Sequence, residues 1–340
     1  MIDYRVLGQP GRDNALYVQV DTGQAIHRLL FDCGEACLRD LSVAQIQAID
    51  ALFFSHFHID HVAGFDSLLR SNYNRPDRPV RIWGPVGAAE IIHHRLRGVT
   101  WNLVAEEPGE FVVTEVDAGR MVSYRFLTNE GFAVAHSGEQ RPFDGTVFDG
   151  PDYQVQARLM DHGMPSVAYC VREPARSNID TSVLAQLGLP PGPWLKRVKD
   201  PTAESQELVQ VGGETRRLGD LRELLVVTRP GESIAYLTDF RLDAQSDESL
   251  VEMLRDCTTI VCENNFRDTD HELAARTFHM VSADVARLAA RAKPKKLVLF
   301  HLSDRYTPTE WQAQLADVRA LFPETYFPAT WEIACEGNHA

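Results

Sequence analysis

The sequence predicts an α/β fold in which two packed mixed β-sheets are covered by outer helices, with a small protruding arm. Apolar runs typical of buried strands dominate the first half, and strands alternate with segments of helical spacing in the second. With 340 residues, of which 44% are hydrophobic and 24% charged, the chain can bury a core of good size. No linker splits these regular parts. We therefore expect one domain over residues 1–340, with an arm-like insertion at about 175–225.

In the first half, strands are expected at residues 29–31, 51–54, 80–83, 153–159 and 167–171. The first two are continuous apolar runs, as in strands buried on both faces. The turn signal Gly84-Pro85 ends the third. The last two follow each other so closely that they are expected to pair.

In the second half, strands are expected at residues 233–237, 258–262 and 296–300, and helices at residues 247–256, 282–292 and 311–321. Apolar residues recur at helical spacing in the helices, and Ser282 fits the N-cap of the second one. Residues 173–230 differ, because several prolines and the pair Gly212-Gly213 interrupt them. They are expected to form a protruding segment or a long ordered loop.

The charge and the absence of targeting signals narrow the class of protein. The 48 acidic and 34 basic side chains give a net charge of -14, which argues against a protein that coats nucleic acid non-specifically but leaves room for a local basic strip. The N-terminus has no signal-peptide pattern, and no apolar run reaches the roughly 18 residues that a transmembrane helix needs. We expect no membrane partner.

The cysteines form no Cys-x-x-Cys pair and lie mostly in apolar surroundings. They are interpreted as reduced thiols of a cytoplasmic protein. They are Cys33, Cys37, Cys170, Cys257, Cys262 and Cys335.

A cluster of histidines and a carboxylate follows the buried strand at residues 51–54. It consists of His56, His58, Asp60 and His61. Imidazole nitrogens and carboxylate oxygens are the ligands that Zn²⁺ and similar cations prefer, and this spacing suits two metals side by side better than one. A solvated histidine cluster is disfavoured, because the run lies at the mouth of a buried strand. His162, Asp239 and His301 each stand at or just past the end of another expected strand and are candidates for the remaining ligands.

These motifs together resemble a known family. The run from His56 to His61 is similar to the signature of the metallo-β-lactamase fold, an αββα sandwich, and further motifs resemble those of ribonuclease Z, the tRNA 3′-processing endonuclease. The further motifs are Phe31-Asp32-Cys33-Gly34-Glu35-Ala36, Leu159-Met160-Asp161-His162, Thr238-Asp239, His279-Met280-Val281 and Leu299-Phe300-His301-Leu302-Ser303-Asp304-Arg305-Tyr306.

The resemblance implies a site with two divalent metal ions, zinc in the first place, with manganese or iron also tolerated. One metal would be held by His56, His58 and His162, the other by Asp60, His61 and His301, and Asp239 would bridge them. A hydroxide between the metals would attack phosphorus. Asp60 would orient this nucleophile, and His279 would take part in proton transfer to the leaving oxygen. Family members often form homodimers, so a homodimer is expected.

The expected arm resembles the segment with which some ribonuclease Z proteins grip tRNA. Residues 189–199 contain Lys196, Arg197 and Lys199 beside Trp194, a combination that suits phosphate contact and stacking. A solvated charged face is an equally good interpretation.

Some positions depart from the family pattern. Ile59 stands where a glycine is usual, Phe240 where a threonine is usual, and Cys262-Glu263-Asn264-Asn265 where the family has His-Glu-Ala-Thr. The N-terminal Gly-Thr-Gly motif is absent. The stretch from about residue 95 to 153 is longer than in the family, and its Trp101, Phe143 and Phe148 are candidates to line or cover a pocket. No departure removes an expected metal ligand.

Three hypotheses follow. The leading one is a dinuclear zinc phosphodiesterase of the ribonuclease Z type that removes 3′ trailers from precursor tRNA. The second is a related metallohydrolase of a small phosphodiester, sulfate ester or lactone, which the altered motifs and the acidic surface favour. The third, a binding protein without catalysis, is disfavoured by the complete ligand set.

Overall fold

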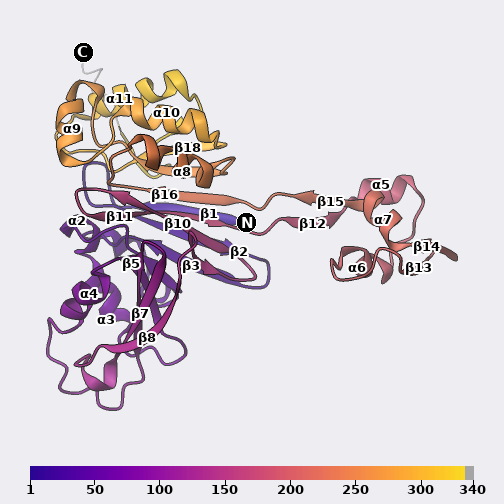
Figure 1. Cartoon of the computed structure of the whole chain (residues 1–340), viewed down its shortest axis with the longest axis horizontal. Coiled ribbons are helices and arrows are strands. Elements are labelled where there is room, and N and C mark those ends of the chain that lie inside the picture. Colours follow the sequence, from indigo (N-terminus) through magenta and orange to yellow (C-terminus); the bar gives the residue numbers. More distant parts are fainter. Residues whose placement is uncertain (334–340) are drawn as a thin grey trace. The chain divides into compact units, whose positions relative to one another are not determined.

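Strands from both halves of the chain form two mixed β-sheets (Figure 1). The structure is a computed structural model that describes residues 1–333, apart from the side chains of residues 244 and 245. The chain forms two compact units. Unit 2 is Glu173–Gly231, and unit 1 is built from the residues on both sides of it.

The first sheet of unit 1 has eight strands in sequence order. They are β1 (Ile2–Leu7), β2 (Ala15–Asp21), β3 (Ile26–Phe31), β4 (Ala51–Phe53), β5 (Val80–Pro85), β6 (Glu110–Asp117), β7 (Arg120–Leu127) and β8 (His136–Pro142). Strands β3 to β6 run parallel, and the flanking pairs are antiparallel. The parallel strands bring their carboxyl ends to one edge of the sheet.

The second sheet has seven strands, which in spatial order are β19 (Thr325–Tyr326), β18 (Lys296–Phe300), β17 (Thr259–Glu263), β16 (Ser233–Leu237), β11 (Pro165–Arg172), β10 (Gln154–Asp161) and β9 (Thr146–Asp149). The expected pair β10 and β11 is antiparallel, with Ala157 opposite Tyr169. Strands β16 to β19 are parallel. Their carboxyl ends therefore share an edge as well.

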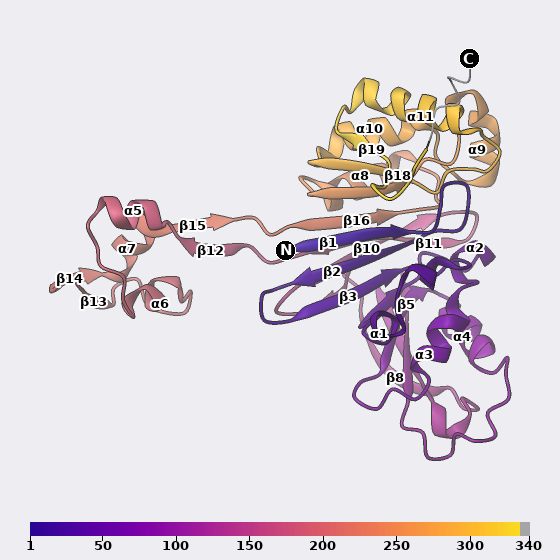
Figure 2. The same ribbon diagram turned by 180° about the vertical axis from the view of Figure 1, so that it is seen from behind.

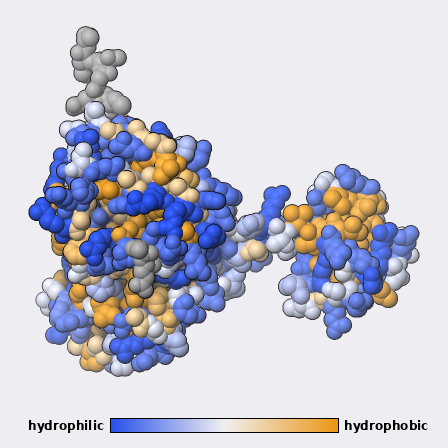
Figure 3. Space-filling view, turned by 45° about the horizontal axis from the view of Figure 1, so that its top comes forward, coloured by the Kyte–Doolittle hydropathy of each residue, from blue (hydrophilic) through white to orange (hydrophobic). Residues whose placement is uncertain are grey.

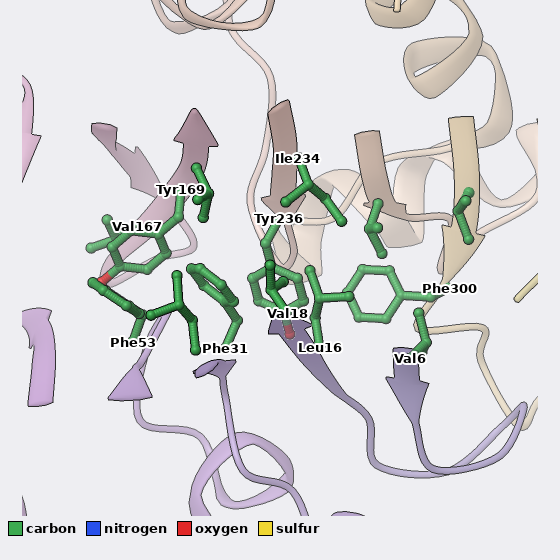
Figure 4. Close-up of a cluster of buried hydrophobic side chains, with 14 of the residues drawn as sticks. Val6, Leu16, Val18, Phe31, Phe53, Val167, Tyr169, Ile234, Tyr236 and Phe300 are labelled. Carbon is green, nitrogen blue, oxygen red and sulfur yellow. The ribbon is translucent and has the colours of Figure 1, made fainter. Parts of the chain in front are cut away.

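A hydrophobic core fills the space between the two sheets (Figure 4). Phe31 of β3 stacks on Phe53 of β4 in this core, with ring centres 5.0 Å apart. Leu30 and Leu52, the neighbours of these residues in the sequence, point to the opposite face of the first sheet, where they pack in a second core. The prediction that these strands are buried on both faces is confirmed.

Helices cover the outer face of each sheet. On the first sheet they are α1 (Val43–Gln47), α3 (Phe65–Asn72) and α4 (Ala88–Leu96), and on the second sheet α8 (Ala244–Leu254), α10 (Ser282–Ala292) and α11 (Pro308–Leu321), which Figure 2 shows from behind. Shorter helices in the connections are η1 (Cys37–Asp40), α2 (Ile59–Val62), η2 (Thr128–Glu130), η3 (Asp268–Asp270) and α9 (His271–Thr277). The four layers are the predicted αββα sandwich, and this prediction is confirmed.

Two local predictions are wrong. Strand β5 continues through Gly84-Pro85, because both residues still pair with β6. The pairing of β5 with β4 ends at Trp83, so the missing N–H of Pro85 leaves no gap in the β4–β5 ladder. Ser282 is the first residue of α10, and Val281 is its N-cap. The five cysteines within residues 1–333 are buried free thiols as expected, whereas Cys335 lies outside the described residues.

Unit 2 has regular structure where an irregular segment was expected. It consists of β12 (Arg176–Ile179) paired with β15 (Val226–Arg229), β13 (Leu208–Val211) paired with β14 (Glu214–Arg217), and the helices α5 (Thr181–Gln186), α6 (Trp194–Lys199) and α7 (Leu218–Leu225). Leu218, Leu221 and Leu225 have helical spacing and pack with Trp194 in a separate core. The prolines therefore lie between short elements and do not prevent them.

The surface of unit 2 is partly apolar. Leu208 is 62% exposed and Leu224 is 53% exposed, and Figure 3 shows hydrophobic residues gathered on part of this unit. Trp194 is not among them, because it is only 7% exposed and its Nε1 donates to the Pro190 carbonyl at 3.1 Å. Within the described residues, no helix combines the length and apolarity that a bilayer crossing demands.

Candidate metal centre

The residues predicted as metal ligands all lie just past the carboxyl ends of strands, either in loops or, for Asp60 and His61, in the short helix α2. The segment from His56 to His61 follows β4, His162 follows β10, Asp239 follows β16, and His301 follows β18. The structure brings all of them together in two groups. One group is His56, His58, His162 and Asp239, and the other is Asp60, His61, His301 and Asp239; within each group the potential ligand atoms lie within 4.8 Å of one another.

Asp239 belongs to both groups because its carboxylate oxygens lie close to imidazoles of each group. Its Oδ2 lies 3.8 Å from Nε2 of His56 and 3.8 Å from Nε2 of His162. The same oxygen is 3.2 Å from Nε2 of His61, and Oδ1 is 3.3 Å from Nδ1 of His301. A carboxylate between two sets of imidazoles has the position of a bridging ligand.

The backbone is strained at two of these residues. Asp239 has φ 44° and His301 has φ 51°, both in the left-handed region that residues other than glycine rarely occupy. Such conformations persist only where the surrounding structure enforces them, and they are common at functional sites. These tight turns bring the two side chains together, with Oδ1 of Asp239 3.3 Å from Nδ1 of His301.

Asp32, at the end of β3, orients two of the histidines. Its fully buried carboxylate accepts hydrogen bonds from Nδ1 of His61 at 2.7 Å, from Oγ of Ser55 at 2.6 Å and from the Tyr236 hydroxyl at 2.9 Å. Because a carboxylate only accepts, His61 carries its proton on Nδ1, and Nε2 is left for a metal. The Ser55 oxygen also lies 3.0 Å from Nδ1 of His56, so Asp32 orients the His56 ring indirectly, through Ser55.

His162 is oriented by a backbone carbonyl. Its Nδ1 donates to the carbonyl of Phe278 at 2.9 Å, so its Nε2 faces Asp239. No sequence signal points to Phe278. Asp32 does carry a signal, since a carboxylate directly after an apolar strand must find buried partners, although its role as the orienting group is visible only in the structure.

His279 lies beside both groups and is held by Glu263. Its Nδ1 is 2.7 Å from Oε2 of Glu263, a fully buried residue at the end of β17 whose other oxygen, Oε1, accepts from the backbone N–H of Phe240. Burial lowers the pKa of His279, but the charge and hydrogen bond of Glu263 outweigh it and raise that pKa to about 9. His279 is therefore a cationic imidazole near neutral pH in the absence of metal.

The protonation states of the candidate ligands depend on one another. Burial, with further repulsion from His61, lowers the pKa of His56 to about 2, so this imidazole is neutral. Burial opposes ionisation of Asp239 and Asp60, yet the neighbouring imidazoles hold both carboxyl pKa values below normal. Burial also opposes protonation of His61, but Asp239 and Asp32 raise its pKa well above normal. Without metal, His61 therefore carries a second proton on Nε2, and a metal ion that binds this nitrogen must displace it, whereas the Nδ1 proton stays in the hydrogen bond to Asp32.

The donor set fits divalent cations. Every candidate ligand is an imidazole or a carboxylate, the donors that borderline divalent metals prefer, and hydrogen bonds fix the orientation of several of them. A cavity of about 490 Å³ opens directly over the groups. Its lining includes His58, Asp60, His162, Asp239, His279 and His301.

The residues that depart from the family motifs differ in how close they lie to the candidate ligands and in how exposed they are. Asn265 lies with its Nδ2 3.0 Å from Nδ1 of His301, whereas Phe240 is fully buried in the core. Ile59 is 70% exposed between His58 and Asp60. Trp101, Phe143 and Phe148 are partly buried against the cores of unit 1 and do not line this cavity.

Known proteins resemble this chain in sequence over almost its full length. Ribonuclease Z of Deinococcus radiodurans is 40% identical over 331 residues, which are 97% of this chain and 99% of that protein. Ribonuclease Z of Methanosarcina acetivorans is 30% identical over 286 residues, 82% of this chain and 79% of that protein. The family model described as "Beta-lactamase superfamily domain" matches residues 27–155.

Solved structures with the same fold are more distant in sequence. The metallo-beta-lactamase fold protein YhfI from Bacillus subtilis has a TM-score of 0.56 at 15% identity, covering 96% of this chain and 95% of YhfI. The short form of human tRNase Z has a TM-score of 0.50 at 17% identity, covering 89% of this chain and 93% of that one. These similarities confirm the metallo-β-lactamase fold.

Proposed function

Because this chain belongs to the ribonuclease Z family of metal-dependent hydrolases, we propose that it removes 3′ trailers from precursor tRNA by hydrolysing one phosphodiester bond. The observation that carries the proposal is the pair of donor groups that share Asp239 beneath an open cavity. A chain that kept the fold without the chemistry would have no need to gather two carboxylates and five imidazoles in these groups.

Two divalent cations, most readily Zn²⁺ and also Mn²⁺ or Fe²⁺, suit the two groups. His56, His58 and His162 would hold one cation, Asp60, His61 and His301 the other, and Asp239 both. When bound, such a pair supplies a water molecule of lowered pKa and positive charge for the phosphoryl oxygens.

The chain's own residues complete the chemistry. His279 lines the cavity and carries a proton that Glu263 stabilises, so it would donate this proton to the leaving oxygen. The Asp60 carboxylate, also in the lining, would accept a hydrogen bond from the attacking water and orient it. The position of both residues on the cavity wall supports these roles.

Unit 2 would contribute to tRNA binding through Lys196 and Lys199. These exposed residues lie three apart on α6 and therefore on one face of the helix. Arg197, the third expected cation, instead pairs with Glu207 and with Asp200. Since Trp194 is buried, the expected base stacking is not part of this proposal.

The test is to measure bound metal and then to compare cleavage of a 3′-extended tRNA precursor with that of bis(p-nitrophenyl) phosphate. Site-specific cleavage of the precursor at its acceptor end is the expected result. Turnover of the small ester alone would refute tRNA processing and favour a hydrolase of small phosphodiesters, sulfate esters or lactones. The acidic body and a cavity of only about 490 Å³ are the observations that support this second candidate.

A further inference from the structure

An arginine that the proposed chemistry does not use packs on Phe278, which lines the cavity over the two donor groups, called the catalytic cavity below. Arg241 is two residues beyond Asp239, and its guanidinium carbon lies 4.8 Å from the ring centre of Phe278. Its Nη2 is 2.9 Å from Oδ2 of Asp161, and its backbone N–H donates to the Asp161 carbonyl. The side chain is still 44% exposed. Because one ion pair occupies only part of the five N–H donors of a guanidinium, Arg241 is oriented and yet able to bind a ligand.

Phe278 connects this arginine to the metal centre. Phe278 lines the catalytic cavity, and its carbonyl orients His162. The ring also packs against Gly163, where an added Cβ would lie only 3.0 Å from it. The aromatic ring therefore contacts both Gly163, which lines the cavity, and the Arg241 guanidinium, which lies next to residues of the cavity wall.

A second hollow continues from the catalytic cavity in the direction of Asp161. This groove of about 650 Å³ shares Gly163 and Met164 with the catalytic cavity, and Asp161, the ion-pair partner of Arg241, is part of its lining. An RNA strand is much longer than the catalytic cavity, so it must leave the cavity along the surface. The groove offers such a path, and Arg241 stands beside it.

The surroundings are acidic, which makes a cation at this place significant. Asp60, Asp239 and Glu263 lie at the metal centre, and the groove adds Asp161 and Asp243. Divalent cations would compensate the carboxylates of the centre, but a second phosphate in the groove would meet only repulsion without a basic group. A guanidinium that is stacked on an aromatic ring is well suited to bind a phosphate.

We propose that Arg241 is a substrate-positioning residue that binds the phosphate next to the scissile one and aligns the RNA strand along the groove. The inference rests on the proposed function, because a small ester has no second phosphate. The competing interpretation is purely structural: Arg241 could serve only to hold Phe278 and, through its carbonyl, His162.

The experiment compares wild type with Arg241→Ala, Arg241→Lys and a control, Arg120→Ala, whose exposed side chain pairs with Asp117 on the first sheet. Steady-state kcat and KM are measured for precursor tRNA and for bis(p-nitrophenyl) phosphate at several KCl concentrations. Arg241→Ala should lower kcat/KM for tRNA about tenfold or more, the usual effect of losing one charge-assisted hydrogen bond, and leave the small ester unchanged. The slope of log(kcat/KM) against log[KCl] should become shallower by roughly 0.7, as for one lost contact to single-stranded RNA.

The lysine variant should retain most of the salt slope, because it keeps the charge, and the control should match wild type throughout. An equal loss on both substrates after Arg241→Ala would overturn the proposal in favour of the structural interpretation. Unchanged tRNA kinetics with an unchanged salt slope would also overturn it. Failure of the proposed function gives a different pattern, in which wild type itself turns over the small ester and no tRNA, and that result would refute both proposals.

Discussion

The metal centre of unit 1 and the surface of unit 2 use charged residues in opposite ways. At the centre, Asp32, His56 and Asp239 are all at most 2% exposed, and buried hydrogen bonds fix their orientation. In unit 2, eight basic and eight acidic side chains balance, so this unit is neutral in a chain of charge -14. Most of its arginines form exposed ion pairs, such as Arg217 with Asp220.

This difference in burial determines how much free energy is lost when one partner of an interaction is removed. Buried groups at the centre cannot be rehydrated when a partner is removed, so each loss leaves an unsatisfied polar group. Exposed ion pairs contribute little, because water and salt replace them. Substitutions at the centre should therefore have large effects on chemistry, and those in unit 2 smaller effects on binding alone.

Removal of divalent cations should have the largest effect. A chelator is expected to abolish cleavage of both tRNA and the small ester, because without cations the carboxylates of Asp60 and Asp239 repel a phosphate. Added Zn²⁺ or Mn²⁺ should restore cleavage, as measured together with metal content by mass spectrometry. Circular dichroism is the control for an intact fold. Full activity with less than one metal ion per chain would contradict the proposed chemistry.

His279→Ala should be next in size. Turnover is expected to fall about 10²- to 10⁴-fold, the usual contribution of a general acid, while bound metal is retained. The matched control is His136→Ala, because His136 also lies 2.7 Å from a carboxylate, Glu130, but on an exposed strand. Metal content and kcat for both substrates provide the measurement. Equal turnover in the two variants would mean that another group supplies the proton.

Asp32→Asn should act on metal affinity more than on the reaction itself. The amide cannot accept all the hydrogen bonds that the carboxylate receives from His61, Ser55 and Tyr236, so metal affinity should fall about 10- to 100-fold. Titration against a competing chelator measures this change. Tyr236→Phe removes a single hydrogen bond to Asp32 and should have a smaller effect. Wild-type affinity in Asp32→Asn would show that His61 is oriented by other contacts.

The sequence indicated which residues come together at the centre, because chemistry limits which residues can stand there. A run such as His56, His58, Asp60 and His61 directly after a buried strand is costly to the fold unless it binds a metal, and the remaining ligands all terminate strands. The orientation of the ligands was beyond sequence reasoning. The carbonyl of Phe278 that fixes His162 belongs to the backbone, and no side-chain pattern marks it.

Unit 2 was predicted poorly because its structure depends on contacts between residues distant in sequence and not on a local motif. Short elements separated by prolines have weak periodicity, and whether Trp194 is exposed depends on a core formed by residues distant in sequence, such as Leu218 and Leu221. The local pattern of cations beside an aromatic residue therefore suggested stacking, whereas packing buries the ring. A prediction from a strong local motif holds whatever the tertiary packing, whereas one from a weak local pattern depends on that packing.

The smallest effect is expected from the double substitution Lys196→Ala and Lys199→Ala. Deleting residues 189–199 would remove Trp194 and Val198 from the core of unit 2, so exposed point substitutions are the cleaner test. If both lysines contact duplex phosphates, tRNA affinity should weaken and its salt slope should become shallower by roughly 0.9 for each lost contact, with turnover of the small ester unchanged. Arg216→Ala, which removes a cation already paired with Glu214, is the matched control and should bind tRNA like wild type. Equal tRNA binding by the double variant and wild type would show that these two lysines make no contact with tRNA.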